Sequence, residues 1–245
     1  MTIELNENER VDDLLIKGYK IIQNTTKFCF GMDAVLLSWF ANVKRGEKVL
    51  DIGTGTGIIP LLLKAKTEGK HFTGLEIQEE MVQMAKRSVS MNDLDDDIDI
   101  IAGDVKSATD IFSRESFSVI TTNPPYMKAT DGFISPDDAK ALSRHEVSCN
   151  LEDIVSNASA LLKVSGRFYM VHRPYRLAEI VSVMKKYHLE PKRMQLVYPF
   201  IDKEPNMLLI EGIKGAKSDI KVEKPLIVYE SPGNYTPEIH KIYGN

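Results

Sequence analysis

The sequence predicts an α/β fold, with a mostly parallel sheet and helices on both of its faces. Three observations lead to this prediction. From residue 48 onward, short apolar runs alternate with segments of helical periodicity. A glycine-rich turn directly follows the first apolar run. The last two runs stand close together with no helix between them, so we expect them to form an antiparallel edge hairpin.

Seven strands are expected. The first is a near-continuous apolar run, Val-Leu-Asp-Ile-Gly, which is typical of a strand buried on both faces. The expected strands cover residues 48–53, 71–77, 99–102, 117–122, 167–172, 194–199 and 207–213. Helical patterns cover residues 58–66, 79–91, 151–162 and 176–188. Asn150 is suited to cap the third of these helices, because its side-chain oxygen can accept from N–H groups of the first turn.

We expect one domain from the 245 residues, because a domain usually holds about 100–200. Its core spans residues 48–213. Residues 1–47 form an N-terminal extension with a helix near 32–41, residues 127–149 form a long connection, and residues 214–245 form a tail rich in Lys, Gly and Pro. The sequence leaves open whether the chain is a monomer or a homodimer.

Composition excludes several classes of protein. Two cysteines, Cys29 and Cys149, cannot make a disulfide framework or a Cys-x-x-Cys metal site. The five histidines lack His-x-x-x-His spacing, so we expect no metal. The polar, acidic N-terminus is unlike a signal peptide, and the apolar runs are far shorter than the roughly 20 residues that span a bilayer. We therefore expect a soluble protein of the cytoplasm.

The net charge of −4, from 31 basic and 35 acidic residues, excludes a strongly basic nucleic-acid binder. The charge is divided unevenly along the chain. Residues 1–159 hold 17 Lys/Arg and 26 Asp/Glu, whereas residues 160–245 hold 14 and 9. The acidic N-terminal part and the basic C-terminal part indicate that the two parts of the chain bind different ligands.

Residues 51–57, Asp-Ile-Gly-Thr-Gly-Thr-Gly, join the first strand to the first core helix. Glycines there allow a tight turn and a close approach of backbone to ligand. A dinucleotide fingerprint would need its third glycine at Ile58 or Pro60, and a P-loop would need Gly-Lys-Ser/Thr, so neither pattern fits. The loop resembles the S-adenosylmethionine (SAM) site of class I methyltransferases, which have a Rossmann-like fold. That resemblance implies a cofactor site formed by Asp51, Gly53, Thr54, Gly55 and Gly57.

Two further acidic residues stand where such a site needs them. Glu76 ends the second strand, 19 residues after Gly57, and a carboxylate there can accept hydrogen bonds from both ribose hydroxyls. Ile77 follows it directly. Asp104 comes after the third strand, where it can accept from the amine of the cofactor's adenine, and Val105 can pack on that ring. We therefore expect these four residues to bind the cofactor.

The fourth strand ends in Asn123-Pro124-Pro125-Tyr126. An exocyclic amine on a planar ring is a poor nucleophile because its lone pair is delocalised. The Asn123 side-chain oxygen and the Pro124 carbonyl can accept from the two amine hydrogens, pull the nitrogen towards tetrahedral geometry and free the lone pair. The prolines add no competing N–H donor, and Tyr126 offers a ring for stacking. Methyl transfer then needs positioning and electrostatics rather than a strong general base.

This motif resembles that of amino methyltransferases acting on adenine, on guanine N2 or on glutamine amides. Further blocks narrow the choice. Those that resemble the bacterial tRNA1(Val) (adenine-N6)-methyltransferase family are residues 12–15, 19–23, 28–37, 144–146, 171–174, 225–229 and 233–238. The resemblance covers nearly the whole chain. It implies methylation of the N6 amine of an adenosine beside the anticodon of a valine tRNA. It also implies a site in which the methionine end of SAM is enclosed by Gln23, Phe30, Gly31 and Asp33, with Asn123 bordering it.

The basic back half is consistent with an RNA partner, because Lys and Arg can contact phosphates. Two candidates stand in the long connection, where a substrate lid is expected. The candidate RNA contacts are Arg144, His145, Arg173 and Arg176, with Lys185, Lys186, Lys192 and Arg193 as further phosphate contacts.

Three other functions compete with this one. A glutamine methyltransferase acting on release factors would share the Asn-Pro-Pro-Tyr motif, but such enzymes typically carry a separate helical domain, for which 47 residues leave little room. A guanine-N2 RNA methyltransferase more often has Phe or Trp after the prolines. A non-catalytic adaptor that binds SAM or RNA is disfavoured, because both motifs are intact.

Overall fold

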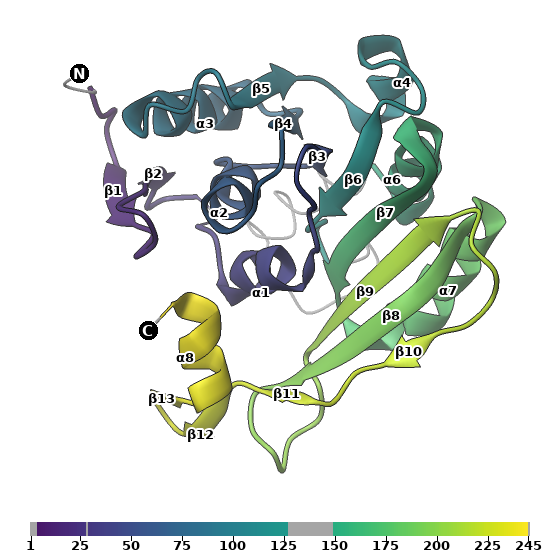
Figure 1. Ribbon diagram of the computed structural model, residues 1–245. Helices are drawn as coiled ribbons and strands as arrows, with labels where there is room; N and C mark the ends of the chain where they lie inside the picture. Colours follow the sequence, from purple (N-terminus) through teal and green to yellow (C-terminus); the bar gives the residue numbers. More distant parts are fainter. Residues whose placement is uncertain (1–3, 28, 127–148, 245) are drawn as a thin grey trace.

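The computed structural model describes residues 4–27, 29–126 and 149–244. A nine-stranded sheet runs through the molecule in the order β10-β8-β9-β7-β6-β3-β4-β5, with β11 also paired to β8 (Figure 1). The pairs from β7 to β5 are parallel, and the two pairs made by β9 are antiparallel. The strands are β3 (Lys48–Ile52), β4 (His71–Glu76), β5 (Ile98–Ala102), β6 (Phe117–Thr122), β7 (Leu162–His172), β8 (Leu189–Tyr198), β9 (Met207–Lys214), β10 (Lys221–Val222) and β11 (Leu226–Ile227).

Helices cover both faces of the sheet, as the sequence predicted. Side chains alternate along each strand, so Val49 and Val119 pack with one set of helices while Leu50 and Ile120 pack with the other. The first set is α1 (Met32–Phe40), α2 (Ile58–Lys66) and α3 (Glu79–Met91), and the second is α4 (Ala108–Ile111), α6 (Leu151–Leu161) and α7 (Leu177–Lys186). A capping box at Asn150 and Asp153 begins α6, which confirms the predicted cap.

All seven expected strands are present, but the edge of the sheet differs from the prediction. The β8–β9 hairpin does not form the outer edge, because the tail runs back along β8 and pairs with it through β10 and β11. These short strands satisfy backbone N–H and C=O groups that β8 would otherwise expose. The prediction missed them because two-residue strands in a polar segment carry no hydrophobic period of their own.

The N-terminal extension contains a hairpin that the sequence did not reveal, β1 (Glu9–Asp13) paired with β2 (Lys20–Asn24). It is attached to α3. Arg87 donates to both carboxylate oxygens of Glu9 at 2.8 and 2.6 Å, which lowers the pKa of Glu9 to about 2. Asn92 bonds both backbone groups of Lys20, at 2.8 and 2.7 Å. The predicted helix of this region is α1, which is almost entirely buried.

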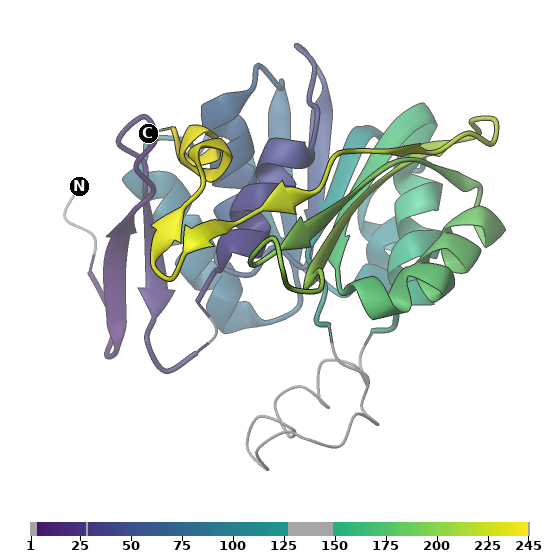
Figure 2. The ribbon, with the colours of Figure 1, turned by 90° about the horizontal axis from the view of Figure 1, so that it is seen from below.

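The tail ends in β12 (Tyr229–Ser231), β13 (Asn234–Tyr235) and α8 (Pro237–Tyr243), none of which the sequence predicted. Ile239 and Ile242 of α8 belong to the same apolar cluster as α1 and α2. The ring of Tyr235 stacks between those of Tyr229 and Tyr243, with centroids 5.2 and 5.7 Å away. Figure 2 shows that these tail elements and the N-terminal hairpin lie at the same end of the molecule.

Candidate active site

A cavity of about 1350 Å³ opens at the carboxyl ends of the central parallel strands. In the sheet β3 stands between β4 and β6, so the strand order reverses direction beside β3. Open α/β sheets bind ligands at such a point. The connections that follow the two neighbouring strands run to opposite faces of the sheet, and a crevice opens between them. The cavity wall includes residues from the glycine loop, from Asn-Pro-Pro-Tyr, from α1 and from the turn after β7.

The glycine loop makes the turn from β3 into α2. Gly53, Gly55 and Gly57 have φ angles of +71°, +56° and +84°, a region that favours glycine. A Cβ atom on Gly57 would also lie 3.3 Å from the Cβ of Ala85 on α3. The first and second glycines line the cavity together with Thr54, whereas Gly57 supports the loop from behind.

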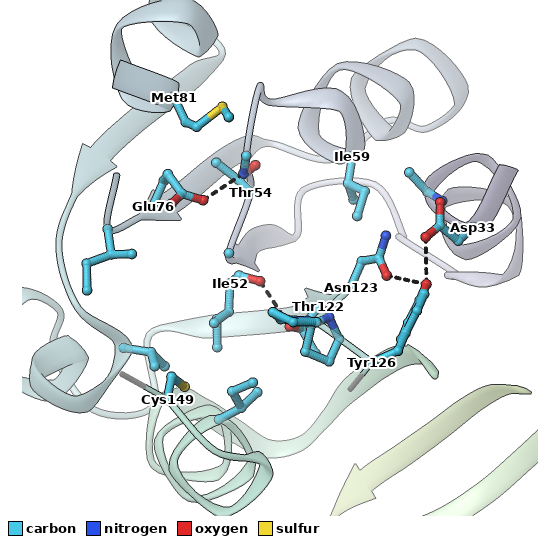
Figure 3. A pocket seen from close by; sticks show the side chains of 18 of the residues that line it. Asp33, Ile52, Thr54, Ile59, Glu76, Met81, Thr122, Asn123, Tyr126 and Cys149 are labelled. Carbon is cyan, nitrogen blue, oxygen red and sulfur yellow. Dashed lines mark hydrogen bonds between the residues drawn. The ribbon is translucent and has the colours of Figure 1, made fainter. Parts of the chain in front are cut away.

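Glu76 organises this part of the wall. Its side chain is 5% exposed, and its two oxygens accept from the backbone N–H groups of Gly55 and Gln78, each at 2.9 Å. A carboxylate has about four lone-pair positions, so both oxygens keep capacity for a ligand. Ile77, 48% exposed, lines the cavity next to it. The carboxylate thus both shapes the glycine loop and borders the cavity (Figure 3).

Asp104 and Val105 also line the cavity, from the turn after β5. The carboxylate of Asp104 accepts from the backbone N–H of Lys106 at 2.9 Å and so begins a short 3₁₀ turn, Val105–Ser107. The side chain of Val105 is buried. The sequence analysis had predicted both residues to lie at the same site as Glu76 and Ile77.

Asp51, in contrast, lies behind the cavity wall. Its carboxylate is 1% exposed and accepts from the Thr121 hydroxyl at 2.7 Å, while its Oδ2 atom has no hydrogen-bond partner within the described part of the chain. Burial raises the pKa of Asp51 to about 7. Gln23 is likewise buried behind the wall, where its side-chain oxygen accepts from the backbone N–H of Phe30 at 2.8 Å. Phe30 and Asp33 do line the cavity.

The Asn-Pro-Pro-Tyr segment leaves β6 and faces the glycine loop across the cavity. The Thr122 hydroxyl donates to the backbone oxygen of Ile52 at 2.9 Å, which ties the ends of β6 and β3 together. The Tyr126 hydroxyl lies 2.6 Å from Asp33 Oδ2 and 2.6 Å from Asn123 Oδ1, as Figure 3 shows. Burial and the neighbouring carboxylate raise the pKa of Tyr126 above its usual value, so the hydroxyl keeps its proton.

The turn after β7 closes the far side of the cavity. The Arg173 guanidinium lies 4.6 Å from the centre of the Tyr126 ring, and the His172 ring meets the Tyr126 ring edge-on at 5.5 Å. A stacking partner of Tyr126 would therefore use the ring face that Arg173 does not occupy. Tyr175, which is 65% exposed, donates to the backbone oxygen of Tyr126 at 2.9 Å. The two loops are thus joined at the rim.

His172 is 1% exposed and lines the cavity. Burial and the charge of Arg176 lower the pKa of His172 to about 4, so the imidazole is neutral near pH 7. Arg176 is itself 7% exposed, and it donates to both oxygens of Glu179 at 3.0 and 2.8 Å. A contact between Arg176 and a phosphate would have to compete with this ion pair.

Four other predicted phosphate contacts are already paired. Lys185 lies 3.5 Å from Glu190 and Lys192 lies 3.9 Å from Asp219. The other two pairs are Lys186 with Glu152 and Arg193 with Glu211. Arg193 also donates to the Phe40 carbonyl at the end of α1 and stacks on that ring, so its role is structural. Two more candidates, Arg144 and His145, lie outside the described residues.

The structure adds wall residues that sequence analysis did not single out. Met81 enters from α3, Cys149 stands just before α6, and Tyr175 comes from the turn after β7. No motif marks the first two, since only the packing of their elements brings them to the cavity. Tyr175 had a local signal, because it directly follows Arg173 and a proline at the end of a strand.

Among the described residues, no helix is long and apolar enough to cross a bilayer. The same residues contain no group of three or more His, Cys, Asp or Glu side chains arranged to hold a metal ion.

Comparison with known proteins identifies relatives of the chain. Residues 43–214 match a methyltransferase domain model. A tRNA1(Val) (adenine(37)-N6)-methyltransferase of Porphyromonas gingivalis is 29% identical over 238 residues, which cover 93% of this chain and 91% of the relative. A protein of the same name from Bacteroides thetaiotaomicron is 31% identical over 185 residues, covering 69% of this chain and 76% of the relative.

Solved structures agree on the fold. A predicted O-methyltransferase from Agrobacterium tumefaciens superimposes with a TM-score of 0.70 at 23% identity, covering 87% of this chain and 96% of the other. A geranyl diphosphate C-methyltransferase from Streptomyces coelicolor, solved with S-adenosyl-L-homocysteine, has a TM-score of 0.56 at 13% identity and covers 74% of each chain.

Proposed function

The chain belongs to the tRNA1(Val) (adenine-N6)-methyltransferase family of class I methyltransferases, and from this membership we propose that it transfers a methyl group from SAM to the exocyclic N6 amine of an adenosine in tRNA. The relatives' name points to adenine 37, the nucleotide beside the anticodon. The observation that carries the proposal is the placement of Asn123 and Tyr126 opposite the glycine loop in one cavity.

The residues of one side of the cavity fit SAM. The buried Glu76 carboxylate keeps lone pairs that suit the two ribose hydroxyls. Ile77 and Val105 offer apolar surface for the adenine ring, and Asp104 can accept from its amine. The loop backbone at Gly53 and Gly55 would lie against the amino acid part, beneath a cover that includes Phe30 and Asp33 of the N-terminal extension.

Asp51 and Gln23 support this site from behind rather than touching the cofactor, since neither lines the cavity. Asp51 holds the strand end through Thr121, and Gln23 holds the backbone at Phe30. Of the residues that the sequence led us to expect as cofactor contacts, these two are therefore proposed as supports of the cofactor site.

The other side of the cavity would hold the target base. A volume of about 1350 Å³ exceeds the roughly 300–1,000 Å³ of a typical small-molecule site, which leaves room for a nucleotide beside the cofactor. The target adenosine would leave its stack and enter against Tyr126. The Asn123 side-chain oxygen and the Pro124 carbonyl would then accept from the two amine hydrogens and make the lone pair available for attack.

Bound SAM would supply the electrophilic methyl group. The protein would hold the amine in line with that methyl and exclude water, which is mainly positioning and electrostatics. Methylation raises the acidity of the amine nitrogen, so the excess proton can leave to water without a strong base. Arg173, at the rim beside Tyr126, is placed to contact the phosphate of the target nucleotide or of its neighbour.

A direct test incubates the protein with methyl-labelled SAM and, in separate reactions, with bulk tRNA, with ribosomal RNA and with release factor. We expect label in tRNA alone, recovered as N6-methyladenosine after digestion to nucleosides. Label in release factor or in methylguanosine would replace the proposal with a glutamine or a guanine-N2 methyltransferase. Bound SAM with no transfer to any acceptor would favour an adaptor. Because tRNA is the expected substrate, we expect the protein to act in the cytoplasm.

A further inference from the structure

The hydroxyl of Tyr126 has more acceptors than it can serve. It lies 2.6 Å from Asp33 Oδ2 and 2.6 Å from Asn123 Oδ1. A tyrosine hydroxyl carries one proton, whereas a carboxylate oxygen and an amide oxygen can only accept. One proton cannot make two full hydrogen bonds, so one of these two close oxygen pairs lacks a hydrogen between its atoms.

The carboxylate is the stronger competitor for that proton. A hydrogen bond to a charged acceptor is roughly twice as strong as one to a neutral acceptor. Asp33 is 8% exposed, and its second oxygen accepts from the backbone N–H of Ala34 at 2.9 Å, near the positive end of α1. Its carboxylate is therefore fixed with one oxygen aimed at Tyr126 (Figure 3).

With its proton engaged by Asp33, the Tyr126 oxygen presents only lone pairs to Asn123. A half-turn of the Asn123 amide exchanges its oxygen and nitrogen, which are similar in size, and brings an N–H donor to those lone pairs. The tyrosine hydroxyl then donates to Asp33 and accepts from Asn123. The same half-turn aims the Asn123 oxygen into the cavity, where a target amine needs an acceptor.

We propose that Asp33 is a positioning residue which, through the hydroxyl of Tyr126, holds the Asn123 amide with its oxygen towards the target amine. This inference rests on the proposed amine methylation and adds the device that orients its acceptor. It joins α1 to the Asn-Pro-Pro-Tyr segment across 93 residues of sequence.

Gly31 makes this arrangement possible. A Cβ atom at Gly31 would lie 2.9 Å from Asp33 Oδ1, closer than real Cβ atoms approach other atoms. A larger residue there would require the Asp33 carboxylate to shift. The glycine is therefore explained by the position of the carboxylate, at a helix start where its φ of −110° would suit any residue.

A swap of acid and amide tests the proposal in the full chain. Asn123→Asp alone leaves a single tyrosine proton between two carboxylates, so we expect the turnover rate at saturating SAM to fall by about 10²–10³-fold. Adding Asp33→Asn supplies an amide donor to the tyrosine oxygen, which frees the tyrosine proton for the new carboxylate at position 123. We expect the turnover rate of the double variant to be at least about tenfold higher than that of Asn123→Asp alone.

The matched control adds Asp110→Asn, at an exposed position of α4, to Asn123→Asp. It should recover nothing. Calorimetric titration with SAM checks that each variant is folded and that the cofactor is saturating. No recovery in the Asp33 double variant, with SAM bound, would overturn the proposal. If the wild-type protein methylates a glutamine or guanine amine instead of adenosine, the proposed function fails. The turnover rates of the same variants are then compared with that acceptor.

A second measurement does not depend on activity. In ¹⁵N-labelled protein with SAM bound, we expect one proton of the Asn123 side-chain amide to exchange slowly with water, since it is donated to Tyr126. Tyr126→Phe keeps the ring and removes the acceptor, so this protection should disappear. Equal exchange of that amide in the wild-type protein and in Tyr126→Phe would contradict the proposed orientation.

Discussion

The two halves of the cavity, which we propose to hold the cofactor and the acceptor base, are built in different ways. In the cofactor half, backbone N–H groups of the glycine loop and of the turn after β4 are held by one buried carboxylate, Glu76. In the acceptor half, side chains from separate elements hold one another: Tyr126 meets Asp33 of α1, Arg173 after β7 and Tyr175 at the rim.

The difference explains why the halves carry signals of different strength in the sequence. A strand, a glycine turn and a helix form a local unit whose geometry follows from nearby residues. The acceptor half depends on contacts between residues 49 and 93 positions apart. We therefore expect changes in the cofactor half to act on SAM affinity, and changes in the acceptor half to act on the rate of transfer.

The largest expected effect separates the halves most sharply. Asn123→Ala removes the acceptor of the target amine without touching the cofactor wall at Glu76. The rate of methyl transfer should fall by about 10²–10³-fold or more, as when one preorganised group of an active site is lost. The SAM dissociation constant, measured by calorimetry, should stay within about threefold. Near-normal turnover would show that the two-acceptor mechanism is wrong.

The second prediction uses pH. His172, in the acceptor half, has a folded-state pKa of about 4, below its ordinary 6.5. Below pH 6.5 the unfolded chain binds a proton that the folded chain refuses, so stability falls as pH drops from 6.5 to 4. The shift corresponds to about 3 kcal/mol. In urea unfolding at stepped pH, the stability of the wild-type protein relative to His172→Gln should fall by this amount between pH 6.5 and 4.

The cofactor half should respond in the opposite direction. Burial raises the pKa of Asp51 from 3.8 to about 7, so the folded state resists ionisation and this group lowers stability as pH rises from 4 to 7. In the same urea series, the difference between wild-type protein and Asp51→Asn should grow with pH. A difference that grows instead as pH falls, as expected for His172, would contradict the contrast between the halves.

The next expected effect is on SAM affinity. Glu76→Ala leaves the backbone N–H groups of Gly55 and Gln78 without their acceptor and removes the charged group facing the cavity. Hydrogen bonds to charged groups contribute about 1.5–3 kcal/mol, which corresponds to roughly 10–100-fold weaker binding. Glu76→Gln is the matched control, since it keeps one acceptor and should lose less. Turnover at saturating SAM should change little in either variant.

The smallest effects concern RNA. Lys185→Ala and Lys192→Ala remove cations that already pair with Glu190 and Asp219, so tRNA affinity should change by less than about twofold. Arg173→Ala, at the cavity rim, should weaken tRNA binding by several-fold and reduce its dependence on salt. Filter binding at two salt concentrations compares them. A stronger effect from the lysines would move the RNA surface to α7 and β8.

Much of the fold followed from sequence. The seven core strands, the glycine turn and the helices α2, α3, α6 and α7 have hydrophobic periods or capping residues of their own. The hairpin β1–β2 and the tail strands β10 and β11 do not. Arg87 joins the hairpin to α3, and the tail strands pair with the open edge of β8, so both contacts are made to residues that lie far away in the chain.

The residues proposed for the cofactor half could be predicted from the sequence itself, because Glu76, Asp104 and the glycine loop follow directly on strands and parallel strands bring their ends to one edge. Only the tertiary structure decided that Asp51 stands behind the wall and that most of the predicted basic surface is neutralised by carboxylates. It alone placed Asp33 against Tyr126. Hydrogen bonds and ion pairs across long sequence distances depend on how elements pack, and no local pattern encodes that packing.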